Sequence, residues 1–333
     1  MGRWFRDHDV APRTDARILT DGDLPAAARL CAVDPVATVL AGSHIADART
    51  YGLQTSGGEL WGFPRTGPLT AVCWAGANLV PVVPPLAGGR GPEVSGTAEE
   101  RAPVDDALHA FARLALHRGR RSSSIVGPAH LVMGMWRFLE DDWPAAREIR
   151  ADQPSMAIRS APLVPIDPDV RVAAPDDFGI VLPASVAMFT EEVGYSPIVA
   201  GGAAYAARVR SLLEQGRTYA HVVPTGMPVA GAGVSPAGPR TAGDRSAGED
   251  RTVVFKADLG AVTDDVAQVQ GVWVDPAFRG QGRSETGMAA VVEHALRRVP
   301  CVSLYVNGFN TRAMAAYKRV GFEQVGTYAT VLF

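Results

Sequence analysis

A strand, a glycine turn and a helix follow one another directly in residues 266–296, and this succession limits the possible folds of the chain most strongly. The apolar run VAQVQGVWV ends at Asp275-Pro276, where proline cannot continue a β-ladder. The turn RGQGRS, residues 279–284, then leads into GMAAVVEHALRR, whose apolar residues recur at helical spacing. At such a junction free backbone N–H groups and the positive end of a helix dipole converge. The pattern therefore predicts an anion-binding turn in an α/β fold.

Two common nucleotide-binding motifs do not fit this turn. The P-loop requires a lysine that the turn lacks. The dinucleotide motif G-x-G-x-x-G is met at Gly280 and Gly282, but Glu285 stands at its last glycine. Gly-x-Gly alone would also suit a tight turn without any ligand. The identity of the anion therefore depends on the residues that follow.

The turn and the segment after it together resemble the GNAT superfamily of acetyl-CoA-dependent N-acetyltransferases. The first family motif, a strand ending V-x-P followed by R-x-x-G-x-G/A, is met except that Ser284 replaces the last residue. The second motif, L-x-V-x-x-x-N-x-x-A-x-x-x-Y-x-x-x-G-F, is met by LYVNGFNTRAMAAYKRVGF, which begins at Leu304. The resemblance covers about residues 170–333. The matching residues are Val274, Pro276, Arg279, Gly282, Leu304, Val306, Asn310, Ala313, Tyr317, Gly321 and Phe322.

The chain also contains an internal echo. Residues 16–26, ARILTDGDLPA, and residues 170–180, VRVAAPDDFGI, each read as a short strand, an acidic turn and a helix start. Asp23 and Asp177 are placed to cap the helices that follow. We therefore expect tandem GNAT-like folds, each with a mixed, mostly antiparallel central sheet flanked by helices. The whole chain resembles actinobacterial proteins that carry a divergent GNAT-like domain before a full GNAT domain.

The predicted domains follow from this echo and from a proline-rich stretch between the halves. We expect an N-terminal arm over 1–15, a divergent GNAT-like domain over 16–158, a linker over 159–169 and a catalytic GNAT domain over 170–333. In the N-terminal half no V-x-P precedes the glycine-rich stretch LAGGRGPEVSG, and Pro92 and Pro103 are expected to interrupt any helix directly after it. This half is therefore expected to lack a cofactor. Residues 234–250, rich in turn formers, are predicted to be a mobile loop.

The resemblance implies acetyl-CoA as co-substrate and assigns its binding residues. Backbone N–H groups of the turn would bind the pyrophosphate, with charge added by Arg279 and Arg283. The backbone of residues 272–274 would hydrogen-bond the pantetheine arm, and Asn310 would lie at the mouth of the site while also capping a helix. The implied cofactor-binding residues are Val272, Trp273, Val274, Arg279, Gly280, Gln281, Gly282, Arg283, Ser284, Asn310 and Tyr317.

The resemblance also implies a proton donor but leaves the general base open. Tyr317 occupies the position that donates a proton to the departing thiolate in many GNAT enzymes. Gln268 and Gln270 hold the positions where many members carry a basic glutamate, and glutamine cannot accept a proton at neutral pH. The candidates are Glu191 and Glu192 at the end of a predicted helix, His221, which is equally compatible with a core position, and a water relay. The catalytic candidates are therefore Tyr317, Glu191, Glu192 and His221.

Composition excludes several other classes of function. A net charge of −3 argues against a nucleic-acid partner, which would require a basic surface. The sequence has no run of 18 apolar residues and a polar N-terminus, so we expect a cytoplasmic protein without a membrane partner. The three cysteines lie in apolar runs and are expected in the core, and no zinc-ligand spacing is present, so no metal is expected.

The expected function is therefore acetyl-CoA-dependent N-acetylation of a primary amine by direct attack in a ternary complex. The acceptor would be a small metabolite, an amino-acid derivative or a peptide N-terminus, and the protein a monomer or homodimer. One alternative is a non-catalytic GNAT-fold regulator that binds acyl-CoA or a metabolite, which the two glutamines favour. Another is an acyltransferase that uses a longer acyl-CoA or a carrier-protein donor.

Overall fold

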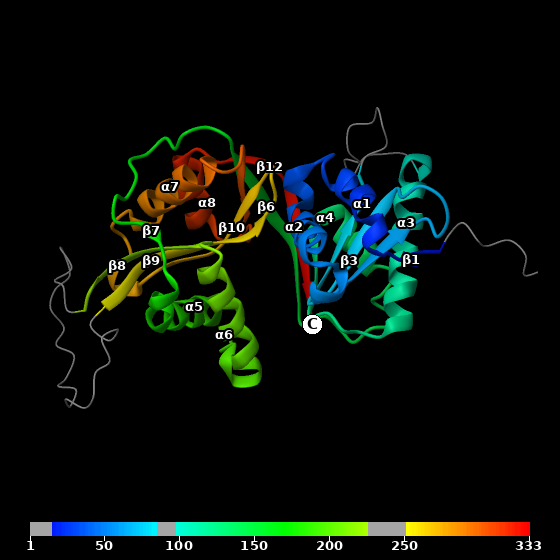
Figure 1. Ribbon diagram of the computed structural model, residues 1–333, viewed down its shortest axis with the longest axis horizontal. Helices are drawn as coiled ribbons and strands as arrows, with labels where there is room; N and C mark the ends of the chain where they lie inside the picture. Colours follow the sequence, from blue (N-terminus) through cyan, green and yellow to red (C-terminus); the bar gives the residue numbers. More distant parts are fainter. Residues whose placement is uncertain (1–14, 85–97, 226–250) are drawn as a thin grey trace, which may run out of the picture.

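A computed structural model describes residues 15–84, 98–225 and 251–333 of the chain. Most of the predicted N-terminal arm, the glycine-rich stretch of the first half and the predicted loop 234–250 lie outside the described residues. Within them, the strands form one sheet in the order β1-β2-β3-β4-β5-β12-β6-β11-β10-β9-β8-β7 (Figure 1).

The two halves have the same order of strands and α-helices: a short strand, two helices, three consecutive strands, and then helix, strand, helix and strand. The strands are β1 (Arg17–Ile18), β2 (Glu59–Phe63), β3 (Ala71–Ala75), β4 (Asn78–Val82), β5 (Ser124–Pro128), β6 (Glu148–Ile158), β7 (Arg171–Val172), β8 (Thr218–Pro224), β9 (Arg251–Val262), β10 (Ala267–Val274), β11 (Val302–Tyr305) and β12 (Glu323–Leu332). The α-helices are α1 (Leu24–Cys31), α2 (Pro35–Tyr51), α3 (Ala98–Arg118), α4 (Ala129–Trp136), α5 (Phe178–Val193), α6 (Ile198–Glu214), α7 (Arg283–Leu296) and α8 (Thr311–Val320).

The predicted fold class is confirmed. In the described part of the chain, the sheet is antiparallel except for the pairs β4–β5 and β10–β11. Helices α7 and α8 pack against one face of the C-terminal half and α5 and α6 against the other. In the N-terminal half, α3 and α4 cover one face and α1 and α2 the opposite face. We expected Pro103 to interrupt a helix at this point, but it lies inside α3 and the helix continues through it. It removes only one amide donor, near the helix start.

The sequence echo corresponds to a repeated structural unit. In the first half, Arg17 pairs with Asp23 at 3.1 Å, and the Asp23 carboxylate accepts the backbone N–H of Thr20. In the second half, Arg171 pairs with Asp177 at 2.6 Å, and the Asp177 carboxylate accepts an N–H three residues before it. Arg171 and the N–H of Ala174 together lower the pKa of Asp177. Neither carboxylate accepts an N–H of the α-helix that follows, so the predicted side-chain caps are not made. Each acidic residue instead ties its strand to the turn that precedes the helix.

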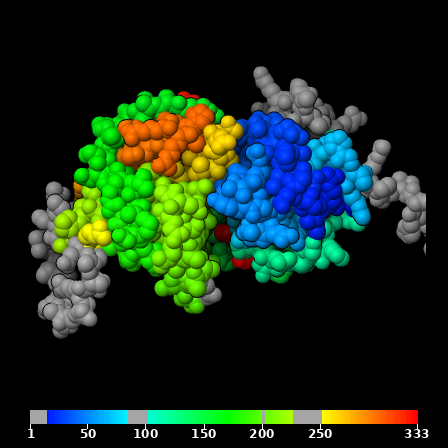
Figure 2. All heavy atoms as spheres, viewed as in Figure 1, coloured from blue at the N-terminus to red at the C-terminus, as the bar shows by residue number. Residues whose placement is uncertain are grey.

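The last strands of the two halves are exchanged within the sheet. β12, from the end of the chain, lies between β5 and β6, and β6 lies between β12 and β11. Met156 and Ile158 of β6 join the core beneath α7, whereas Ala329 and Val331 of β12 join the core beneath α3 and α4. The division of the chain at the linker stays a prediction, because the sheet runs across it. Figure 2 shows a hollow between α6 and the N-terminal helices, with atoms of the C-terminal strand at its base.

A β-bulge bends β10 in the middle of its course. The register with β9 shifts between Gln270 and Trp273, and Gly271 in the bulge has a φ of 59°. The ammonium of Lys256, which is fully buried, donates to Asp258 Oδ2 at 2.7 Å and to the Gly271 carbonyl at 3.3 Å. A buried ion pair therefore supports the bulge from β9.

Substituting Gly271→Ala should lower the free energy of unfolding by about 1–3 kcal/mol. Alanine is strained at this positive φ, and its Cβ would lie 2.9 Å from Asp258 Oδ2 and 3.1 Å from Met188 Sδ. Urea unfolding measures the change. Gly326→Ala, where an added Cβ meets nothing within 4 Å, is the control and should be neutral. Equal stability of the two variants would contradict this account of the bulge.

The three cysteines should be unreactive in the folded protein. All three are buried, as predicted, and burial raises the pKa of Cys31 to about 12 and the pKa of Cys73 and Cys301 above the ordinary range. Ellman's reagent at pH 8 should therefore label none in the native state and all three in urea. Unfolded thiols ionise near pH 8.5, so the free energy of unfolding should fall as the pH rises from about 8.5 towards 11. Native labelling at the unfolded rate would refute this.

Candidate active site

Two adjoining clefts lie where β10 and β11 separate. The strands pair only at Ala267–Val302 and Gln268–Ser303, after which β10 continues alone along its β11 side. The first cleft, of about 400 Å³, lies along residues 279–285 and is called the turn cleft. The second, of about 330 Å³, contains Tyr305 and Tyr317 and is called the tyrosine cleft. Both are lined by Glu191, Val272, Trp273 and Asn310, so they are continuous.

The backbone of the predicted phosphate turn has a conformation that favours glycine at two positions. Gly280 and Gly282 have φ angles of 79° and 75°, which disfavour any residue with a Cβ. A Cβ added at either position would meet nothing within 4 Å, so the turn is open to solvent. Gly282 is the N-cap of α7, whose first amide groups have no partner within the helix. The turn therefore presents free N–H donors and the positive end of the α7 dipole.

Most of the predicted cofactor-binding residues come together here. All of them line the turn cleft except Gln281, which lines neither cleft, and Tyr317, which lines the tyrosine cleft. Asn310 also caps α8, since its Oδ1 accepts the Ala313 N–H at 3.1 Å. The residues from the predicted set that line the turn cleft are Val272, Trp273, Val274, Arg279, Gly280, Gly282, Arg283, Ser284 and Asn310.

Each arginine of the phosphate turn has a carboxylate partner. Arg279 donates from Nη2 to Glu191 Oε2 at 2.7 Å and from Nε to the Val274 carbonyl at 2.9 Å. Arg283 Nη1 lies 3.6 Å from Asp167 Oδ2. These contacts hold both guanidinium groups beside the turn. An anionic ligand would compete with the carboxylates for them.

Two further arginines line the turn cleft and were missed in the sequence. Arg312 and Arg319 are seven residues apart on α8, a spacing that puts them on one face of the helix. Arg319 donates to Glu285 at 2.6 Å, which lowers the pKa of that carboxyl group. The helical spacing of these two arginines, read together with the N-cap at Asn310, was the signal available in the sequence.

Tyr317 is positioned in the tyrosine cleft as a protonated phenol. It lies in α8 and is 7% exposed. Burial and the nearby charge of Glu192 raise the pKa of Tyr317 well above its ordinary value near 10. Burial likewise raises the pKa of Tyr305 to about 12. Both hydroxyl groups therefore keep their protons at neutral pH and can donate them.

The two adjacent glutamates at the end of α5 have different partners. Glu191 accepts from the Trp273 indole N–H at 3.3 Å and from Arg279, and it lines both clefts. Glu192 lines only the tyrosine cleft, with its Oε1 3.7 Å from Arg150 Nη1 on β6. Gln270 also lines this cleft and donates to Gln268 at 3.0 Å, so these two glutamines satisfy each other.

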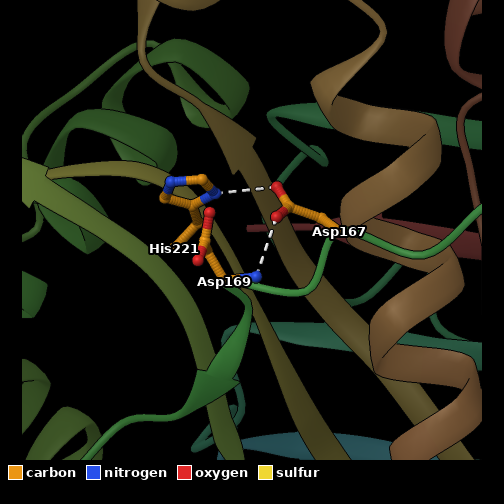
Figure 3. Close-up of side chains that lie close together, drawn as sticks. All are labelled: Asp167, Asp169 and His221. Carbon is orange, nitrogen blue, oxygen red and sulfur yellow. Dashed lines mark hydrogen bonds and ion pairs between the residues drawn. The ribbon is translucent and has the colours of Figure 1, made fainter.

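His221 is not brought to either cleft. It is buried on β8, with Nδ1 2.7 Å from Asp167 Oδ2, and the backbone N–H of Asp169 donates to the other oxygen of Asp167 (Figure 3). Among the described residues, these three form the group whose ligand atoms lie close enough, within 4.8 Å, to hold a metal ion. Arg283 already supplies positive charge to Asp167. The geometry gives His221 a structural partner and no route to an acceptor.

Comparisons with known proteins agree with this reading of the second half. Residues 209–322 match the acetyltransferase (GNAT) family, and residues 58–181 match a domain family of unknown function, DUF4081. A curated relative, the peptidyl-lysine N-acetyltransferase YjaB of Salmonella typhimurium, is 38% identical over 58 residues. That match covers 17% of this chain and 37% of the relative.

Solved structures share the fold over nearly the whole chain. A GCN5-related N-acetyltransferase from Sphaerobacter thermophilus has a TM-score of 0.52 and 18% identity, covering 95% of this chain and 93% of its own. A putative acetyltransferase from Pyrococcus horikoshii has a TM-score of 0.50 and 10% identity, covering 99% and 94%. No helix in the described ranges has both the length and the apolar character needed to cross a membrane. Residues 209–322 therefore belong to the GNAT acetyltransferase family.

Proposed function

We propose that the C-terminal half binds acetyl-CoA across the two clefts and transfers its acetyl group to a primary amine. The observation that carries this proposal is the separation of β10 from β11, which joins an open phosphate turn at one end to the buried phenol of Tyr317 at the other. An elongated donor with an anionic end and a reactive end fits such a path.

The donor would be held by groups that the chain already presents. Free N–H groups of the turn and the positive end of α7 suit the pyrophosphate, with charge from Arg279 and Arg283. Backbone groups of residues 272–274 that have no partner on β11 suit the amides of the pantetheine arm. The thioester would then reach the tyrosine cleft, where the amine enters.

In the reaction the amine nitrogen attacks the thioester carbon, and the C–S bond breaks from the tetrahedral intermediate. We assign removal of a proton from the entering ammonium to Glu192, because Glu191 is bound to Arg279 and Trp273. Tyr317 donates its proton to the departing thiolate and regains one from the nitrogen through water. The products are the amide, coenzyme A as a thiol, and one proton released from Glu192.

There are two alternative functions, and a specific observation favours the first of them. A non-catalytic regulator that binds acyl-CoA or a metabolite is favoured by Gln268 and Gln270, which replace a basic glutamate. A buried phenol facing the clefts has no use in such a regulator. A longer acyl-CoA or a carrier-protein donor would use the same turn, and the volume available at the thioester end decides between donors.

The acceptor class remains part of the proposal. We propose a small-molecule or peptide amine, in a cytoplasmic protein that is a monomer or homodimer and uses no metal. The curated relative carries the name peptidyl-lysine N-acetyltransferase, so lysine peptides join free amines and amino-acid amides in the first acceptor panel.

Calorimetric titration of acetyl-CoA tests donor binding first. The wild type should bind with micromolar affinity, and the double variant Arg279→Ala, Gly282→Asp should bind about 100-fold more weakly or not at all. The double variant Arg137→Ala, Gly326→Asp is the control, since Arg137 is another exposed, ion-paired arginine far from the clefts. Absence of wild-type binding would refute the proposed function.

Tyr317→Phe should lower kcat about 100-fold and leave the acetyl-CoA dissociation constant unchanged. The thiolate would lose its proton donor, while the ring would keep its packing. Thiol release with the acceptor panel measures the rate. Tyr219→Phe is the control because Tyr219 is also buried but lines neither cleft. An unchanged kcat would remove Tyr317 from the mechanism.

A further inference from the structure

We propose that Arg150 is a positioning residue that holds Glu192 in the acceptor site, so that the exchanged strand β6 completes the site of the other half. This inference rests on the proposed function, in which Glu192 accepts a proton from the amine. It also gives the N-terminal half a direct part in the reaction, although that half is expected to bind no cofactor of its own.

Arg150 contacts both the backbone and the side chain of Glu192. Its Nη2 donates to the Glu192 carbonyl at 3.2 Å, and its Nη1 lies 3.7 Å from Glu192 Oε1. The Arg150 side chain is only 11% exposed, whereas that of Glu192 is 54% exposed. A fixed cation therefore lies behind a carboxylate that still reaches the cleft.

The guanidinium of Arg150 is itself held in place from its own strand. Glu148 accepts from Nε at 2.8 Å and from Nη2 at 3.0 Å, a bidentate pair that fixes the plane of the group. These bonds raise the pKa of Arg150, so its charge is constant at any working pH. Arg150 therefore acts as a rigid anchor and not as a mobile surface side chain.

The anchor lies at the last turn of α5, where a cation has a second effect. Carbonyl groups at a helix C-terminus lack intrahelical partners and carry partial negative charge. The bond from Arg150 to the Glu192 carbonyl satisfies one of them. Because Glu191 and Glu192 lie in this turn, its order determines where both carboxylates point.

A second residue of β6, Gln153, lies at the tyrosine cleft itself. Gln153 is buried and lines the tyrosine cleft; its Nε2 donates to Asn307 Oδ1 at 2.8 Å, and its Oε1 accepts from Thr330 Oγ1 at 2.7 Å. Thr330 belongs to β12, the other exchanged strand. The wall of the tyrosine cleft is therefore fixed by hydrogen bonds between strands from both halves.

The lining of the tyrosine cleft indicates the chemistry of the acceptor. It contains two carboxylates, four side-chain amides and two phenols, and among its described residues there is no lysine or arginine. Carboxylates attract an ammonium, and amides and phenols suit hydroxyl or amide groups beside it. A cationic amine with hydrogen-bonding neighbours fits this lining, whereas an acceptor with a carboxylate next to the amine does not.

Steady-state kinetics of Arg150→Gln test the inference. The acceptor probe is whichever of tyramine, spermidine, glycinamide and an N-acetylated lysine peptide gives the fastest thiol release with the wild type. The variant should lose about tenfold or more in kcat/KM for this amine while its acetyl-CoA dissociation constant stays within twofold. Arg150→Lys keeps the positive charge but lacks the planar group that binds Glu148 through two hydrogen bonds, so it should recover only part of the loss. Arg137→Gln, at an ion-paired arginine that lines neither cleft, is the control and should behave as wild type.

A double-variant comparison separates positioning from general destabilisation. Glu192→Gln alone should cause at least the loss seen in Arg150→Gln, and adding Arg150→Gln to it should cost little more, because both act through one carboxylate. Additive losses, or equal weakening of amine and acetyl-CoA, would show that Arg150 merely supports the fold and would overturn the inference.

Hydrogen exchange of residues 186–195 gives a readout that needs no acceptor. Amide exchange in this segment should be several-fold faster in Arg150→Gln than in the wild type or Arg137→Gln, with β10 unchanged. If the wild type binds no acetyl-CoA, the proposed function fails, yet this measurement still decides whether Arg150 orders the end of α5. Wild-type exchange in Arg150→Gln would overturn the inference whatever the kinetics.

Discussion

The pairing of β6 with β12 is the contact on which the rest of the structure depends. Each strand ends one half of the chain, and each has its other neighbour in the opposite half. Met156 of β6 and Val331 of β12 lie fully buried in the cores of those opposite halves. Withdrawing either strand would break the sheet between the two halves and expose apolar side chains in both cores. The strands of the two halves therefore form one continuous sheet.

The same exchange explains why the clefts form where they do. β11 pairs with β6 over four residues but with β10 over only two, so its course follows the exchanged strand. β10 bends the other way at the bulge, which Gly271 permits and the buried Lys256–Asp258 pair supports. The backbone of β10 beyond the bulge is thus left without a partner on its β11 side. One non-local pairing and one local bulge together create the donor path.

The arginines beside the turn could bind an anion, and each of them is paired with a carboxylate. Arg279 and Glu191 are 40% and 46% exposed, so their ion pair is screened by solvent and contributes roughly 0–1 kcal/mol. In the proposed complex a pyrophosphate would bring more charge and accept several backbone N–H groups of the turn as well, so it would exchange with Glu191 at small cost. The buried Asp167 beside Arg283 is different, since it keeps His221 and the Asp169 amide as partners when the arginine turns towards a ligand.

Sequence reasoning succeeded where the determinants are local and stopped where they are not. The glycine turn and the Asn310 cap depend on residues within a few positions of one another. The order of β6 and β12 depends on pairings between residues more than a hundred positions apart, which no local pattern encodes.

His221 has a suitable residue type for a base, but its strand places it away from the clefts. Glu191 and Glu192 are equivalent in sequence and differ only in the arginine each one meets. The phosphate turn supplies Arg279 and the exchanged strand supplies Arg150. Sequence alone therefore cannot distinguish the two glutamates, because the arginine beside Glu192 comes from the other half of the chain.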